Sequence, residues 1–307
     1  MAVAGSSTTD AALAAFDDHL RRVRGVCPEV RWTYGRVAGE FLEMMFGDGP
    51  VDLTRLSASD VVGFVFAATV RYRPSTLQGV TTALRSFLRF LRVEGVRDDR
   101  LEEAVPKVPL RRLSVLPRHL GSGELARLIA SLDQRDSPTG LRDRAMLLLA
   151  ARLGLRASEI ARLGLGDIDW RTGTVQIRTR KTGHGALLPL PREVGEAIAS
   201  YLQHGRPVSE DRHVFVLHQQ RVGAPIDRHV VGDVARRALD RAGIDAPVRG
   251  ANLLRHSLAT DMLAHGASLK EIADLFGHRA LSSTQVYAKV DIVALRDVAL
   301  PWPEVTR

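Results

Sequence analysis

A short basic segment with three prolines divides this chain of 307 residues into two parts. Residues 104–121, AVPKVPLRRLSVLPRHLG, contain Pro106, Pro109 and Pro117, and proline prevents regular helix while favouring extended backbone. A chain of this length suits two domains of ordinary size. We therefore predict a helical N-terminal domain over 1–104, a linker over 105–120 and a second domain over 121–307, which ends in a tail over 291–307.

The part before the linker repeats apolar residues at three- and four-residue spacing from residue 11 to about 104. The stretches AALAAFDDHLRRV, TYGRVAGEFLEMMF, SASDVVGFVFAAT and STLQGVTTALRSFLRFLRVEG predict a bundle of about four helices. Ser57 and Ser75 stand where residues that cap helix N-termini are expected.

The part after the linker changes its hydrophobic period once. Helical patterns lead to Gly154, which is typical of a helix C-terminus. In DIDWRTGTVQIRTRKTGHGALLPL, the stretch TVQIRTR alternates, RTG and KTGHG carry turn residues, and ALLPL is a short apolar strand. We predict a mainly α protein with a small three-stranded antiparallel sheet in its C-terminal domain.

The charge of the chain favours a polyanionic partner. Its formal net charge is +8 and its sequence pI is about 10.3, and each phosphate that a basic residue neutralises releases counterions and adds affinity. Nucleic acid is the expected partner, with a merely basic soluble protein as the alternative. The linker has no acidic residue and is expected to follow a phosphate backbone, unless it is simply solvated. Its basic residues are Lys107, Arg111, Arg112 and Arg118.

Several classes of site have no support in the sequence. Cys27 is the single cysteine, so an internal disulfide is excluded and a metal–thiolate site is not expected. The histidines show no metal-binding spacing, and there is neither a phosphate-binding glycine loop nor a Gly-x-Ser-x-Gly turn. The start of the chain does not read as a signal peptide and the longest apolar stretch, VVGFVFAATV, is too short to span a bilayer, so we expect a cytoplasmic protein without a membrane partner.

Five residues stand in a fixed order within recognisable motifs. They are Arg156 in GLRASEIARL, Lys181 in TRKTGHG, Arg255 in NLLRHSLAT, His278 in LFGHRALSSTQVY, and Tyr287. Tyr287 follows His278 by nine residues, and His278 follows Arg255 by 23. This order and spacing resemble the tyrosine recombinases, the family of phage integrases and Xer-type resolvases, across essentially the whole chain.

The resemblance implies that DNA is cut without a metal ion. Tyr287 would attack phosphorus and form a 3′-phosphotyrosyl link, which conserves the bond energy, so no cofactor is expected. Arg156 and Arg255 would each clamp the phosphate with two donors, a geometry that lysine cannot reproduce. Glu159, three residues after Arg156 on the same helical face, is expected to orient that guanidinium.

The resemblance also implies an acid and a further phosphate ligand. Lys181 would donate a proton to the leaving oxygen, a task for which the pKa of arginine is too high. A lysine at this place, next to Arg180 in a chain that favours arginine, supports that assignment. His278 would donate a hydrogen bond to the phosphate.

One position departs from the family pattern. Most members have histidine three residues before the second arginine, where this chain has Asn252. Asparagine can donate a hydrogen bond to phosphate but cannot accept the tyrosine proton. His256 does not replace that histidine, because it lies about 6 Å further along the helix. We therefore expect water or His278 to serve as the base, and slower cleavage near neutral pH.

The resemblance further implies a two-domain clamp around a specific double-stranded DNA site, with four protomers needed for strand exchange. The tail over 291–307 would join neighbouring subunits or fold back on its own domain, and accessory proteins can be required. The expected role is integration or excision of a mobile element. Two alternatives stay open: a non-catalytic or weakly catalytic DNA-binding accessory protein, and DNA relaxation by a type IB topoisomerase mechanism.

Overall fold

The computed structural model describes residues 8–277, apart from 110–118, 134–136, 179–184 and 247. The chain forms two compact units, Met1–Arg111 and Arg112–Arg307. The described part is mainly helical and contains one three-stranded antiparallel sheet. This confirms the predicted class of secondary structure. The DNA-binding role of the first unit and the clamp stay predictions.

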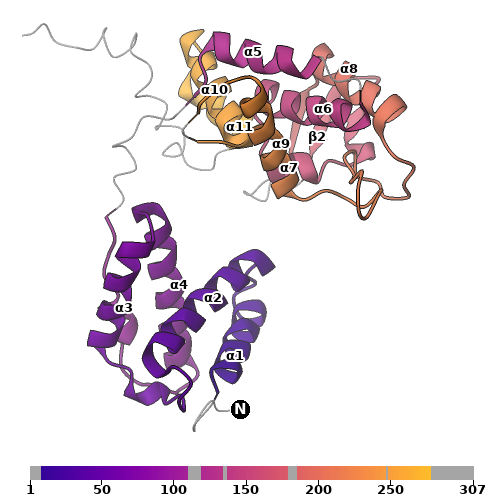
Figure 1. Cartoon of the computed structure of the whole chain (residues 1–307). Helices are drawn as coiled ribbons and strands as arrows, with labels where there is room; N and C mark the ends of the chain where they lie inside the picture. Colours follow the sequence, from indigo (N-terminus) through magenta and orange to yellow (C-terminus); the bar gives the residue numbers. More distant parts are fainter. Residues whose placement is uncertain (1–7, 110–118, 134–136, 179–184, 247, 278–307) are drawn as a thin grey trace, which may run out of the picture. The chain divides into compact units, whose positions relative to one another are not determined.

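The first unit contains four α-helices that share one core (Figure 1). They are α1 (Thr9–Arg22), α2 (Pro28–Phe46), α3 (Ala58–Arg71) and α4 (Pro74–Val93). The 3₁₀ turn η1 (Leu53–Arg55) lies between α2 and α3, and η2 (Leu101–Ala104) follows α4. The core is aromatic where α1 meets α4. There the rings of Phe16 and Phe87 meet edge to face with centroids 5.2 Å apart, and Phe90 lies 5.3 Å from Phe16.

Two predicted helix starts differ in outcome. Ser57 caps α3 and shares a capping box with Asp60, as predicted. The prediction for Ser75 was wrong by two positions, because α4 begins at Pro74 with Arg73 as its cap. Proline suits the first position of a helix, since its missing N–H would have no partner there.

The second unit is built around α6 (Pro138–Arg152), whose stretch AMLLLAA is buried on every side. Around it lie α5 (Ser122–Asp133), α8 (Arg192–Ser200), α9 (Arg228–Arg241) and α10 (Ala251–Ala264). The π-helical turn η4 (Tyr201–Gly205) extends α8. A helix that is apolar around its whole circumference needs such complete enclosure.

The sheet consists of β1 (Ile168–Asp169), β2 (Thr174–Ile177) and β3 (Ala186–Pro189), in that order and antiparallel. Val175 pairs with both Ile168 and Leu188, and the pairing of β2 with β3 ends at Ile177 and Ala186. The η3 turn (Leu165–Asp167) leads into the sheet. β2 lies in the alternating stretch TVQIRTR, β3 lies in ALLPL, and the predicted three-stranded antiparallel sheet is confirmed.

Three further segments meet at one end of the second unit. α6 ends at Arg152, and Gly154, with φ of 62°, turns the chain into α7 (Ala157–Ala161), as expected for a helix-terminating glycine. α11 (Leu269–Phe276) packs beside α10 (Figure 1). Gly277, in the left-handed conformation, ends α11. The site described next lies where Gly154, α7, α10 and the end of α11 come together.

Candidate active site

Arg156 occupies the N-cap of α7, and Glu159 contacts it twice. Glu159 Oε2 accepts the backbone N–H of Arg156 at 2.9 Å, while Oε1 accepts the guanidinium Nη1 at 2.8 Å. Glu159 is 5% exposed, so burial holds its carboxylate in one place. One carboxylate therefore fixes both the start of α7 and the direction of the Arg156 side chain.

Arg255 lies on α10 and its side chain is buried, with 5% of the residue exposed. Its Nη1 donates to the carbonyl of Gly154, and its Nη2 donates to the carbonyl of Phe276 at 3.0 Å. The guanidinium carbon lies 3.8 Å from the centroid of the Phe276 ring. These contacts offset part of the cost of taking a charged group out of water.

The two guanidiniums converge on a single oxygen. The carbonyl of Phe276 accepts Arg255 Nη2 at 3.0 Å and Arg156 Nη1 at 3.4 Å. This carbonyl belongs to the last turn of α11, where carbonyls have no partner within the helix. Arg156 and Arg255 are positively charged and Glu159 is negatively charged, so the three side chains together carry a net charge of +1. This charge favours binding of an anion beside them.

Gly154 is needed at this junction for two reasons. Its φ of 62° is unfavourable for any residue with a side chain. A Cβ atom here would also overlap the ring of Phe276 and lie 3.2 Å from Cδ2 of Leu258. Glycine thus lets the Phe276 ring pack directly against the backbone that precedes Arg156.

Asn252 and His256 lie on the same helix as Arg255 but in different surroundings. Asn252 is exposed, in the first turn of α10. His256 is half-buried, and its pKa is lowered by burial and by the neighbouring charge of Arg255. His256 is therefore neutral near pH 7, which agrees with a packing role for this ring.

Lys181 falls in the segment that joins β2 to β3 and lies outside the described residues. At the end of β2, Arg178 forms an ion pair with the buried carboxylate of Asp167. Asp167 Oδ2 also accepts the backbone N–H of Gly164 at 2.8 Å. These contacts attach the strand that leads to Lys181 to the turn before the sheet.

Other predicted site residues also lie outside the described part of the chain. They are His278, Tyr287, the tail over 291–307, and Arg111, Arg112 and Arg118 of the linker. Lys107 is described and is exposed. Just before it, Arg85 Nη2 donates to the carbonyls of Val105 and Pro106 at 2.9 and 2.8 Å, which holds the start of the linker segment against α4.

Phe276 is the residue of this site that the sequence analysis did not single out. A signal was available, because Phe276 comes two residues before His278 and directly before a glycine. A buried phenylalanine nevertheless reads as ordinary core from sequence alone. Its contacts with two arginines appear only when α7, α10 and α11 are assembled.

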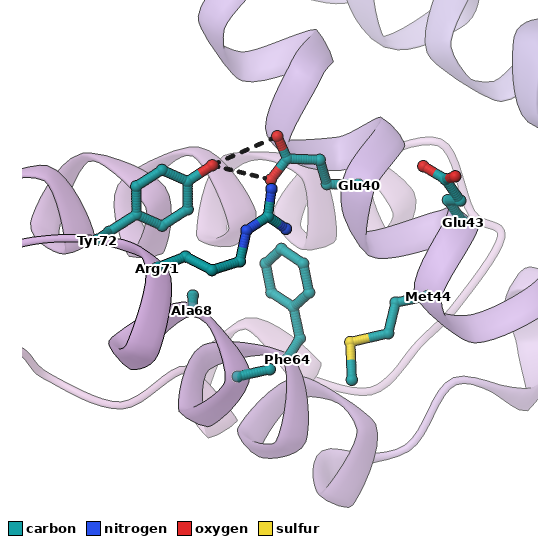
Figure 2. A pocket seen from close by; sticks show the side chains of 8 residues that line it. Glu40, Glu43, Met44, Phe64, Ala68, Arg71 and Tyr72 are labelled. Carbon is teal, nitrogen blue, oxygen red and sulfur yellow. Dashed lines mark hydrogen bonds between the residues drawn. The ribbon is translucent and has the colours of Figure 1, made fainter.

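A pocket of about 400 Å³ in the first unit lies between α2 and α3 (Figure 2). None of the predicted site residues lines it. The Tyr72 hydroxyl donates to Glu40 at 3.1 Å to one oxygen and 3.4 Å to the other, and Arg36 forms an ion pair with the same carboxylate. The polar groups beside this pocket bind one another and join α2 to the end of α3.

Neither a membrane-spanning helix nor a metal-binding cluster occurs among the described residues. No helix there has the length and apolar character to cross a membrane. No group of three or more His, Cys, Asp or Glu side chains in that part of the chain is placed to hold a metal ion.

Comparison with known protein sequences gives consistent matches. The model of the phage integrase family matches residues 118–292, more than half of the chain. A putative integrase/recombinase, y4rA, of Sinorhizobium fredii is 44% identical over 298 residues, which cover 97% of this chain and 72% of that protein. The tyrosine recombinase XerD of Mycobacterium tuberculosis is 32% identical over 300 residues, with 93% and 95% covered.

Solved structures share the fold at lower identity. XerH site-specific recombinase, bound to palindromic difH substrate, matches with a TM-score of 0.75 and 17% identity over 98% of each chain. A lambda integrase dimer bound to a COC′ core site matches with a TM-score of 0.68 and 16% identity, covering 98% of this chain and 81% of that one. At these identities the likeness shows the fold alone.

Proposed function

The chain belongs to the phage integrase family of tyrosine recombinases, and from this premise we propose that it is a site-specific recombinase that cuts and rejoins DNA through Tyr287. The observation that carries the proposal is the meeting of Arg156 and Arg255 at one oxygen, 3.4 and 3.0 Å away. Two guanidiniums held on rigid helices are suited to the non-bridging oxygens of one phosphate.

The reaction needs a nucleophile, charge neutralisation and a leaving-group acid. The Tyr287 hydroxyl oxygen bonds to phosphorus and loses its proton, while the bond from phosphorus to the 5′ oxygen breaks and Lys181 protonates that oxygen. Arg156, Arg255 and His278 stabilise the charge on the non-bridging oxygens. Attack by the 5′ hydroxyl of another strand then releases Tyr287 and restores a phosphodiester.

We propose that Asn252 slows the cleavage step of this cycle. An exposed amide one turn before Arg255 can donate a hydrogen bond to the phosphate but takes up no proton. The tyrosine proton then passes to water or to His278. Cleavage is slower near neutral pH than in an enzyme with an imidazole at this place.

DNA contact by the first unit is proposed for the exposed face of α4. Over its 20 residues α4 has three arginines and no acid. Small and polar residues make this face, which lets a helix approach a phosphate backbone closely. The contacts of Arg85 hold the segment before Lys107 against α4, and we propose that Lys107 and the linker residues Arg111, Arg112 and Arg118 also contact the phosphate backbone. The exposed residues of α4 include Ser75, Gln78, Gly79, Thr82 and Arg89.

Assembly and biological role follow from family membership. We propose that the two domains close around a specific double-stranded site as a clamp. Four protomers then exchange strands, with the tail over 291–307 joining neighbours. Names such as integrase/recombinase among the relatives favour movement of a mobile element in the cytoplasm. Accessory proteins can take part in determining whether the element is integrated or excised.

The test uses a nicked suicide DNA substrate built from sequence that flanks the gene, because the cut strand then loses the end that would religate. Wild-type protein should form a covalent adduct visible on a denaturing gel, and Tyr287→Phe should form none while binding the DNA equally. Absence of an adduct from wild type, with binding demonstrated, would favour the accessory role. Relaxation of supercoils without recombinant products would favour topoisomerase chemistry.

A further inference from the structure

Phe276 touches both arginines of the candidate site through two different groups. Its carbonyl accepts Arg255 Nη2 and Arg156 Nη1. Its ring lies under the Arg255 guanidinium, whose central carbon is 3.8 Å from the ring centroid.

The ring itself has little freedom to move. Phe276 is fully buried at 0% exposure, in a small cluster with Ala259, Leu263 and Ile272. On the side of Gly154, a Cβ atom would lie 3.0 Å from the ring Cζ, so the ring abuts backbone there. A ring in such a slot presents its face to Arg255 in a single orientation.

The position of the guanidinium follows from these contacts. A guanidinium has five N–H groups in one plane and donates in several directions at once. An aromatic face attracts the cation and favours a parallel guanidinium plane over it. The carbonyls of Gly154 and Phe276 then fix the rotation of the guanidinium within that plane.

We propose that Phe276 is a positioning residue, whose ring face and carbonyl hold Arg255 in the orientation that binds the scissile phosphate. The inference rests on the proposed function, in which Arg255 contacts that phosphate. Phe276 itself touches no DNA. Its loss should therefore slow cleavage without comparable loss of DNA affinity, because affinity is spread over many phosphate contacts.

The experiment measures single-turnover adduct formation on the suicide substrate with a graded series at this position. Phenylalanine is replaced by its 4-fluoro, 3,5-difluoro and 3,4,5-trifluoro forms, which weaken the negative potential of the ring face while nearly keeping its shape. Every member retains the backbone carbonyl. The cleavage rate should fall stepwise with fluorination, and Phe276→Leu should lose about three- to thirtyfold.

The matched control is the same series at Phe215. That ring is also fully buried in the second unit, and it stacks on Tyr201 with centroids 5.7 Å apart. The cleavage rates of the Phe215 variants should not change with fluorination. Thermal unfolding of each variant checks that the fold is intact, and DNA affinity at Phe276 should change less than twofold.

The outcomes distinguish failure of the positioning role of Phe276 from failure of the recombinase function. If wild type forms the adduct and the Phe276 series is flat, or falls no more than the Phe215 series, Phe276 is a packing residue and the positioning role is wrong, while the recombinase function stands. If wild type binds the DNA and forms no adduct, the proposed function fails and this inference fails with it. A stepwise fall confined to Phe276 supports both.

Discussion

At the scale of single residues, Asn252, Arg255 and His256 lie within five residues of α10 but have different environments. Asn252 is exposed, Arg255 is buried against Phe276, and His256 is half-buried with a lowered pKa. In the proposed mechanism, an imidazole at the exposed position would take the proton of Tyr287 and pass it to water. The amide of Asn252 can donate a hydrogen bond to phosphate but cannot accept that proton.

Asn252→His should therefore raise the rate of adduct formation, by up to about a hundredfold where the imidazole is neutral. The gain should appear as the pH rises through about 6.5, the ordinary pKa of histidine, because the protonated ring cannot act as a base. Asn252→Gln, which offers an amide of similar chemistry, is the control and should give no such pH dependence.

The measurement is the single-turnover rate of both variants between pH 5 and pH 8, on the same suicide substrate. His256 is present in both proteins, so a new titration reports the introduced ring. An Asn252→His protein that cleaves no faster than wild type at any pH would show that proton acceptance at this place does not limit the reaction.

At the scale of elements, the site depends on a turn between two helices. The stretch from Ala145 to Ala151 of α6 is buried, and Gly154 is the point where the chain leaves this helix and reaches Arg156 within two residues. The close approach of the Phe276 ring ties this turn to the end of α11. A side chain at Gly154 would push apart the two elements that carry the shared carbonyl and Arg156.

Gly154→Ala and Gly173→Ala form a matched pair of variants. Both glycines have φ of 62°, but a Cβ at Gly173 meets nothing within 4 Å, whereas one at Gly154 overlaps the Phe276 ring. Gly173→Ala should lower the free energy of unfolding by about 1 kcal/mol for the left-handed backbone. Gly154→Ala should cost about 1–3 kcal/mol more, as overpacking does.

Chemical denaturation of both variants gives the two free energies of unfolding, and their difference measures the cost of crowding Phe276 and, to a lesser extent, Leu258. Adduct formation should fall for Gly154→Ala and stay near the wild-type rate for Gly173→Ala. Equal losses of stability would mean that the ring moves aside at little cost, and the packing of Phe276 against this turn would then have no energetic weight.

At the scale of the whole molecule, the dominant property is positive charge, with a formal net charge of +8. Several arginines are paired with nearby carboxylates, as Arg21 is with Asp18 on α1 and Arg92 of α4 is with Glu102 of η2. Unlike α1, α4 contains no acidic residue of its own. The net charge thus favours DNA in general, and the face of α4 offers a place where a phosphate backbone can lie.

Arg89→Gln should weaken DNA binding and lower the slope of log affinity against log salt by about one. Arg21→Gln is the control, because Arg21 is exposed but lies 2.6 Å from a carboxylate oxygen of Asp18 on α1. Its slope should match that of wild type. Binding isotherms at several salt concentrations give both slopes, and equal slopes for the two variants would place the DNA elsewhere on the first unit.

The sequence by itself determined the elements and the chemistry that they bring. Periodicity predicted the helices and the central strand, and turn residues placed a three-stranded sheet around it, because side-chain patterning is a local property of the chain. Motif order identified Arg156, Lys181, Arg255, His278 and Tyr287, whose roles stay predictions. Local capping preferences were a weaker guide, since Pro74 starts α4 ahead of the predicted Ser75.

The tertiary structure alone decided which distant groups meet. No local pattern predicts that the guanidiniums of Arg156 and Arg255 meet at the carbonyl of Phe276, or that the Phe276 ring packs against Gly154. These contacts join segments that are far apart in the chain and exist only when α6, α10 and α11 pack together. Tertiary packing determines these contacts, because a close-packed interior has few positions in which a buried ring fits and a buried charge also finds hydrogen-bond partners.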